Sequence, residues 1–167
     1  MDLDSALTGK SGEPASAIRV LCDDHAEMRR LIAQYRDAQA DSTHARHAII
    51  QAIGLQAELH ARIEEEVFYP AVQRLVPQFV EHAHEAHGTA AAKIDALKAM
   101  EPSEPEYVEI ADQLIEALTT HMDDEERSLF PRVEKEMAGE LKDLGTQLIR
   151  KKEQLTQSVE DMEGPAT

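Results

Sequence analysis

The most constraining feature of this chain is a phrase that occurs twice, 61 residues apart. HARIEEEVFYPAV begins at His60, and HMDDEERSLFPRV begins at His121. The copies align without a gap and share a histidine, two consecutive glutamates, an aromatic residue, a proline and a valine. Chance does not easily produce six matched positions. The repeat therefore predicts two related halves that contribute the same polar residues to one structure.

A further histidine precedes each copy at nearly the same distance. His25 lies 35 residues before His60, and His87 lies 34 residues before His121, each in an alanine-rich stretch that favours helix. Each half thus supplies one histidine followed by a His-x-x-x-Glu pair. Two such halves, packed with pseudo-twofold symmetry, would bring four histidines and two glutamates together. This combination of side chains is typical of a metal site.

Helical geometry selects one glutamate of each repeat. At about 100° per residue, Glu64 lies roughly 40° around the helix from His60 and about 6 Å along its axis, so both can reach one site. Glu65 lies roughly 140° from His60, toward solvent or the edge of a neighbouring helix. We therefore expect Glu64 and its repeat equivalent Glu125 to be ligands. Alanine at Glu65 or Glu126 is expected to leave the metal content nearly intact.

The types of side chain narrow the choice of metal. Imidazole nitrogens with carboxylate oxygens suit iron, manganese or zinc, whereas soft copper sites and iron–sulfur clusters use thiolates. Cys22 is the only cysteine. Because a carboxylate can bridge two cations, four histidines and two glutamates could hold a pair of irons and leave open positions for a small ligand. The alternative is an acidic bundle with surface or core histidines, since a single His-x-x-x-Glu is equally an intrahelical contact.

Residues beyond the two glutamates are candidates for the wall of the site. Phe68 and Leu129 lie one turn further along the expected metal face, where they wall the pocket or simply pack in the core. Tyr69 follows directly and is either a route for electrons or a structural tyrosine. Pro70 and Pro131 lie in otherwise helical patterns, so a kink or a helix end is expected at equivalent positions.

The remaining histidines differ in where they lie on their expected helices, and this position decides whether they can reach the site. His84 lies three residues before His87, about 60° around the helix, and could supply a fifth imidazole or contact a ligand. His82 points elsewhere, and His44 and His47 lie early on the helix that carries the first repeat. These three are expected on the surface.

Composition indicates one all-α domain. The chain has 167 residues, 42% of them hydrophobic, and no stretch alternates with strand period or approaches the length of a membrane span. A net charge of −16 argues against nucleic acid as a partner. The N-terminus lacks a signal-peptide pattern, and we expect a cytoplasmic protein without membrane contact.

We expect a flexible tail over 1–13, a helical domain over 14–137, and a further helix with a tail over 138–167. The expected helices cover about 16–39, 43–74, 77–100, 105–137 and 139–155. The fifth is amphipathic, and it either covers its own domain or mediates a dimer; packing on its own domain is the preferred interpretation.

With these residues placed, the chain resembles the haemerythrin-like HHE cation-binding family. The resemblance covers roughly residues 16–137 and rests on DDHAEMRRLI, HARIEEEVFYP, the EAH that ends at His87, and HMDDEERSLFP. It implies an up-down-up-down four-helix bundle, here with an additional C-terminal helix, and a non-haem, oxo- or hydroxo-bridged di-iron centre. The implied iron ligands are His25, His60, Glu64, His87, His121 and Glu125, with both glutamates bridging.

The chain departs from the oxygen-carrying haemerythrins in its third and fourth helices. Those proteins place two histidines four residues apart on the third helix, where this chain has Ala83 and Ala91 on either side of His87. They also place a carboxylate five residues after the last histidine, whereas Glu125 follows His121 by four. The chain looks more like bacterial haemerythrin-like proteins, including actinobacterial ones with a trailing helix.

Those relatives are associated with peroxide, nitric oxide and iron handling. The expected function is binding or reduction of a small oxidant (O2, H2O2 or NO) at an open iron position, in oxidative or nitrosative stress or in iron handling. Whether the protein is an enzyme, with catalase-like or NO-reactive activity, is left open. The alternative is a non-catalytic iron or oxygen sensor, or an iron reservoir, that acts through a partner. A monomer and a homodimer both fit the sequence.

Overall fold

The computed structural model describes residues 15–38 and 43–163, and within this range the chain forms helices joined by short turns. The expected tail over 1–13 lies outside the described residues. The elements are α2 (Ala17–Asp37), α3 (Thr43–Ile63), η2 (Glu64–Phe68), α4 (Tyr69–Val72), α5 (Pro77–Ala99), α6 (Pro105–Asp124), η3 (Glu125–Leu129), α7 (Phe130–Glu136) and α8 (Leu141–Glu163).

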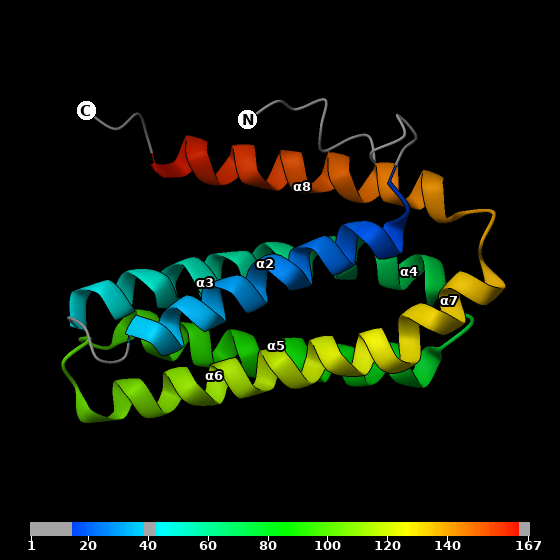
Figure 1. The fold of residues 1–167 in the computed structure, drawn as a ribbon. Helices are drawn as coiled ribbons and strands as arrows, with labels where there is room; N and C mark the ends of the chain where they lie inside the picture. Colours follow the sequence, from blue (N-terminus) through cyan, green and yellow to red (C-terminus); the bar gives the residue numbers. More distant parts are fainter. Residues whose placement is uncertain (1–14, 39–42, 164–167) are drawn as a thin grey trace.

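The fold is a four-helix bundle with an additional C-terminal helix, as the sequence predicted. In Figure 1, α2 and α3 form one antiparallel layer, α5 and α6 form the other, and α8 lies across the outer side of α2 and α3. Helix α8 extends well beyond the expected end at residue 155. Its buried leucines, Leu144 and Leu148 among them, pack on the bundle. The prediction that this helix packs on its own domain is therefore confirmed.

The start of α2 fits closely against α8. Ser16 caps α2, because its Oγ accepts a hydrogen bond from the Arg19 backbone N–H at 3.3 Å. Gly145 of α8 faces this turn, and a Cβ at that position would lie 2.0 Å from the carbonyl oxygen of Ala15. Only a residue without a side chain lets the two backbones approach so closely.

Each of the two repeated helices contains one wide, π-helical turn. The Tyr69 N–H donates to the Glu64 carbonyl five residues earlier, and the Phe130 N–H donates to the Glu125 carbonyl in the same way. Pro70 and Pro131 follow at the starts of α4 and α7. Proline removes a backbone donor and collides with the preceding turn of an α-helix, and a wide turn relieves both problems. The expected disturbance at the prolines therefore takes the form of two equivalent π turns.

A polar layer crosses the bundle between two apolar clusters. Along α2, Leu21 belongs to one cluster, Met28 belongs to the other, and His25 lies between them. On α3 and α5, His60 and His87 likewise lie between members of the two clusters. Among the described residues, the buried polar or charged side chains are Asp24, His25, His60, Glu64, His87, His121 and Glu125. Burial of so many ionisable groups is costly unless they are paired or bind a metal, so this layer is the candidate site.

None of the described helices is both long and apolar enough to cross a membrane.

Candidate metal centre

Six side chains from all four helices of the bundle converge in the polar layer. The glutamates Glu64 and Glu125 are 0% exposed, and the four histidines are also buried. Each glutamate occupies the first position of a π turn, directly after the α-helix that carries its histidine. The structure thus brings together all six residues that the sequence singled out as candidate ligands.

The four imidazoles form two facing pairs. Nε2 of His25 lies 3.1 Å from Nε2 of His60, and Nε2 of His87 lies 3.0 Å from Nε2 of His121. The first pair joins helices α2 and α3, and the second joins α5 and α6. Each layer of the bundle therefore contributes one pair.

Both carboxylates reach both histidine pairs. Oε1 of Glu64 lies 3.4 Å from Nε2 of His60, and its Oε2 lies 3.2 Å from Nε2 of His87. Oε2 of Glu125 lies 3.3 Å from Nε2 of His25 and 3.5 Å from Nε2 of His121. Two groups of ligand atoms result, each with its atoms within 4.8 Å of one another, and Glu64 belongs to both. This is the arrangement that a bridging carboxylate requires.

The outer nitrogens of three histidines face carboxylates. Nδ1 of His25 lies 2.8 Å from Glu126, Nδ1 of His87 lies 2.8 Å from Glu65, and Nδ1 of His60 lies 3.3 Å from Asp24. An imidazole that donates its Nδ1 proton outward presents the lone pair of Nε2 to the centre, which is how metal-binding histidines are normally oriented.

One oxygen of each central carboxylate lacks a hydrogen-bond donor. Oε1 of Glu64 and Oε2 of Glu125 are buried and have no hydrogen-bond partner among the described residues. Buried acceptors without a donor are costly. Cations placed beside these oxygens and the Nε2 atoms would remove that cost, so these residues fit a metal centre with nitrogen and oxygen ligands.

The charges of the metal-free site follow from this geometry. Burial lowers the pKa of His60, but Glu64 and Asp24 more than offset that effect and raise the pKa to about 10. Burial likewise favours the neutral form of Glu64, yet His60, His121 and His87 hold its pKa well below the usual value. His60 is therefore protonated at both ring nitrogens at neutral pH in the metal-free protein, and a metal ion has to displace the Nε2 proton.

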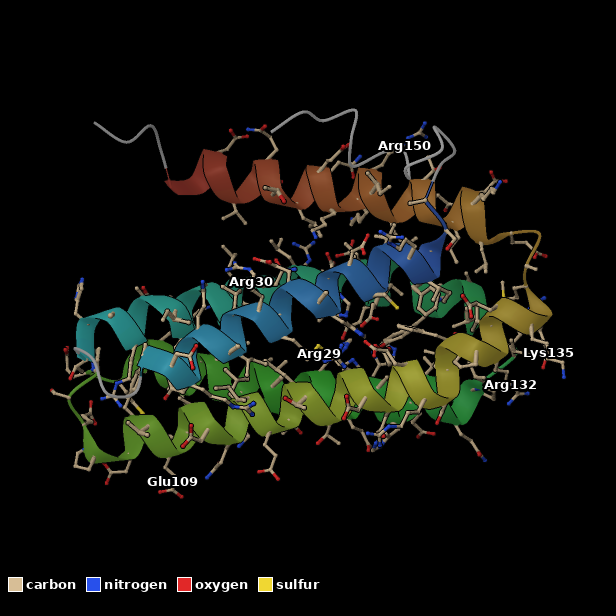
Figure 2. The ribbon with its side chains drawn as sticks, in the orientation of Figure 1. Arg29, Arg30, Glu109, Arg132, Lys135 and Arg150 are labelled. Carbon is tan, nitrogen blue, oxygen red and sulfur yellow. The ribbon has the colours of Figure 1, made fainter. Side chains whose placement is uncertain are left out.

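Glu65 and Glu126 do not simply point to solvent. Each accepts a hydrogen bond from a histidine on a helix of the opposite layer. Of the two expected directions, solvent or the edge of a neighbouring helix, the structure therefore shows the helix edge. Arg29 holds Glu126 at 2.7 Å and Asp123 at 3.0 Å, and Figure 2 shows it between α2 and α6. Helical angles could indicate the edge that Glu65 faces, but not the histidine across it.

Asp24 is a site residue that the sequence reasoning missed. It adjoins His25 in the chain, but its carboxylate contacts His60 on α3 and Lys152 on α8. The repeat gives no signal for it, because the residue before His87, which corresponds to Asp24 in the second half, is Ala86. The contacts of Asp24 with Lys152 and His60 depend on how α8 and α3 pack against α2.

The aromatic residues of the repeat differ in what they contribute. The Tyr69 hydroxyl lies 3.0 Å from Oε2 of Glu64 and 2.9 Å from Oε1 of Glu125, and its ring stacks on His87. Burial and these two carboxylates raise the pKa of Tyr69 strongly, so the hydroxyl keeps its proton and donates it. Phe130 stacks on His25 in the equivalent place and has no hydroxyl.

The π turns explain why Tyr69 occupies this position. An α-helix would place Phe68 over Glu64, whereas the wide turn brings the fifth residue there instead. Phe68 and Leu129 are fully buried in the adjoining apolar cluster. Their predicted role as pocket walls and ordinary core packing are both compatible with this placement.

The remaining histidines lie outside the cluster of six. His84 is 47% exposed, with Nδ1 3.6 Å from Glu65 and its ring against Tyr69, so it is not placed as a fifth imidazole. His82 is exposed as expected. His44 is also exposed as expected. His47 is half-buried, and its Nδ1 lies 2.9 Å from the Tyr107 hydroxyl.

Known proteins share this sequence pattern and this fold. A crystal structure described as a hemerythrin HHE cation binding domain-containing protein, the Rv2633c homolog from Mycobacterium kansasii, superposes with a TM-score of 0.74 at 28% identity. The match covers 86% of this chain and 89% of that one. No curated protein matches the sequence. The sequence pattern of the hemerythrin HHE cation binding domain matches residues 16–133, and the chain therefore belongs to that family.

Proposed function

We propose that the protein holds two iron ions between its histidine pairs and binds or reduces a small oxidant (O2, H2O2 or NO) there. The observation that carries this proposal is the reach of Glu64 and Glu125, each of which lies close to both histidine pairs in a buried layer. In this assignment His25 and His60 bind one ion, and His87 and His121 bind the other. Glu64 and Glu125 would each bridge the two ions.

The ligand count favours reactivity over a purely structural role. Shared between two ions, four imidazoles and two carboxylates leave coordination positions free for a small molecule. Iron would supply the redox chemistry when bound. The protein's own residues hold the ligand set, exclude bulk water through the two apolar clusters and keep a protonated tyrosine, Tyr69, against the bridging carboxylates.

A second function, as an iron or oxygen sensor or an iron reservoir, is favoured by one contact. Lys152 on α8 contacts Asp24, which in turn contacts His60. A change at the metal centre could therefore alter the packing of α8, which a partner could detect. Metal-dependent movement of α8 without turnover would favour this alternative.

The first test is metal content per chain with the visible and near-ultraviolet spectrum of protein produced with ample iron. The proposal expects close to two irons and the charge-transfer bands of a bridged ferric pair. Zinc, or no metal even after anaerobic iron reconstitution, would contradict it. Oxygen release from added peroxide and NO binding by the reduced protein are then measured to determine which oxidant the protein binds or reduces.

The iron content of glutamate-to-alanine variants tests which glutamates are ligands. Glu64→Ala and Glu125→Ala should each lose most of the iron, because each removes one bridge. Glu66→Ala is the matched control, since Glu66 pairs with Arg62 and Lys151 at the surface and contacts no histidine of the site. Equal iron loss in Glu64→Ala and Glu66→Ala would contradict the assignment.

A further inference from the structure

A small cavity reaches the histidines from the seam between α3 and α5. Its volume is about 50 Å³, and three of the four site histidines line it: His60, His87 and His121. The rest of the lining, apart from Glu58, is apolar: Met28, Ala57, Ala61, Ala90, Ala91, Ile94, Leu118 and Met122.

The mouth of this cavity is formed by small residues. Ala61 on α3 is half-buried, and Ala91 on α5 is exposed, whereas Ala57 and Ala90 lie deeper. Neither Ala61 nor Ala91 has a side chain long enough to close the seam beside the histidines, and the Lys98–Glu58 ion pair joins α5 to α3 about one helical turn away from Ala61. A stripe of alanines alone would be unremarkable in a helical bundle, but here it adjoins a cavity that ends at the candidate ligands.

A wider cavity continues the seam toward the far end of the bundle. It has a volume of about 480 Å³ and shares Glu58 and Ile94 with the inner cavity. Gly54 lines it, although a Cβ there would meet only Ile94, at an ordinary 3.4 Å. Glycine inside a helix lowers stability by about 0.5–1 kcal/mol relative to alanine. Close packing against Ile94 does not require it here, whereas a larger side chain would take up part of the cavity.

We propose that small uncharged molecules reach the metal centre through the α3–α5 seam, by way of the inner cavity between Ala61 and Ala91. This inference rests on the proposed function. The inner volume has room for a molecule of only a few heavy atoms. Apart from Glu58 and the site histidines its lining is apolar, so an ion would lose hydration on the way to the centre. Dioxygen, nitric oxide and hydrogen peroxide meet both conditions, whereas larger or charged oxidants do not.

A rival route lies between α5 and α6. A cavity of about 240 Å³ in that groove touches His121, but no other histidine of the site. Ala117 lines it and is half-buried, as Ala61 is in the α3–α5 seam. The two alanines therefore provide a matched pair of positions at which a longer side chain can obstruct one route and leave the other open.

The kinetic test uses nitric oxide as the probe and the iron-loaded, reduced protein. Ala61→Met and Ala91→Met should each lower the second-order rate constant for NO binding about tenfold, equivalent to about 1.4 kcal/mol of added barrier. Iron content and the final spectrum should not change, because neither alanine is a ligand. Ala117→Met should bind NO at the wild-type rate. Slowing by Ala117→Met alone, or by none of the three, would overturn the proposed route.

A second measurement does not depend on iron chemistry. Crystals of the full-length protein as isolated, pressurised with xenon, should show xenon between α3 and α5 in the wild type and none in Ala61→Met. Absence of xenon from the wild-type seam would count against the route. If the wild type holds no iron, the proposed function fails, and the xenon result still decides whether the seam admits a small apolar guest.

Discussion

Lys152 is predicted to be required for tight metal binding, although it lies on α8 and outside the bundle. Its ammonium group contacts one carboxylate oxygen of Asp24, and the other oxygen lies 3.3 Å from Nδ1 of His60. Burial raises the pKa of Asp24, but His60 and Lys152 together bring it below its usual value. Lys152→Met removes the charge and keeps most of the aliphatic side chain, so it tests this chain of contacts with little loss of packing.

The expected magnitude follows from the burial of the two partners. An exposed ion pair contributes about 0.2–1 kcal/mol, whereas loss of one partner of a buried pair costs about 3–5 kcal/mol. The Lys152 side chain is 32% exposed and that of Asp24 only 6%. We therefore expect Lys152→Met to lower the free energy of unfolding of the metal-free protein by about 1–2 kcal/mol.

Metal affinity should change in the same direction. Groups that orient a ligating histidine are typically worth about 10–100-fold in affinity. Because Asp24 itself remains in Lys152→Met, we expect the lower end, about tenfold, whereas Asp24→Ala removes the acceptor and should approach about 100-fold. Anaerobic titration of metal-free protein with iron(II) against a competing chelator measures both.

Lys151→Met is the control for this prediction. Lys151 is the adjacent residue on α8, carries the same charge and pairs with Glu66, which contacts no histidine of the site. Its loss should leave iron affinity within about twofold of wild type, as a surface pair contributes little. Equal loss of affinity in Lys151→Met and Lys152→Met would show that α8 acts through overall charge or packing, and would refute the argument from Asp24.

Three further predictions concern single residues. Glu65→Ala should lower iron affinity about tenfold, because His87 loses the acceptor of its outer nitrogen, whereas Glu64→Ala should abolish binding of the metal pair in the same titration. Tyr69→Phe should keep two irons per chain but lower the unfolding free energy of the metal-free protein by about 1–3 kcal/mol, since two buried carboxylates lose a donor; a denaturant titration with an unchanged midpoint would contradict this. Gly145→Ala should destabilise the protein by about 1–3 kcal/mol through the clash with the backbone before α2, while Gly88→Ala, with nothing within 4 Å of its Cβ, should stabilise it by about 0.5–1 kcal/mol. Thermal melts of the two variants check both signs.

The sequence contained enough information for the bundle and for the six converging side chains. Helical periodicity and the repeat both depend on local spacing, and His60 and Glu64 needed only one turn of helix between them to face the same site. The convergence of His25, His60, His87 and His121 followed from the assumption of pseudo-twofold packing. That assumption held because the repeat carries matched apolar residues around matched polar ones.

The contacts around those six side chains could not be predicted in the same way. Angles counted on a regular α-helix placed Phe68 over Glu64, but the π turn advances the chain by one residue and brings the Tyr69 hydroxyl to both carboxylates. The partners of Glu65 and Asp24 lie on other helices, at sequence separations of 22 and 128 residues for the His87 and Lys152 contacts. Such contacts depend on how helices are rotated against one another, which no local pattern records.

The repeat also conceals a difference between the two halves of the site. Near α2 and α3, the outer nitrogens of His25 and His60 both face carboxylates, Glu126 and Asp24, and a cation stabilises each of these carboxylates: Arg29 and Lys152 respectively. On the α5 and α6 side, His87 has Glu65, but the outer nitrogen of His121 has no partner among the described residues. Groups that accept the outer proton raise the basicity of a ligating imidazole and fix its orientation. The first pair is therefore held more firmly than the second. If each pair holds one ion, as proposed, we expect the two metal positions to be chemically unequal.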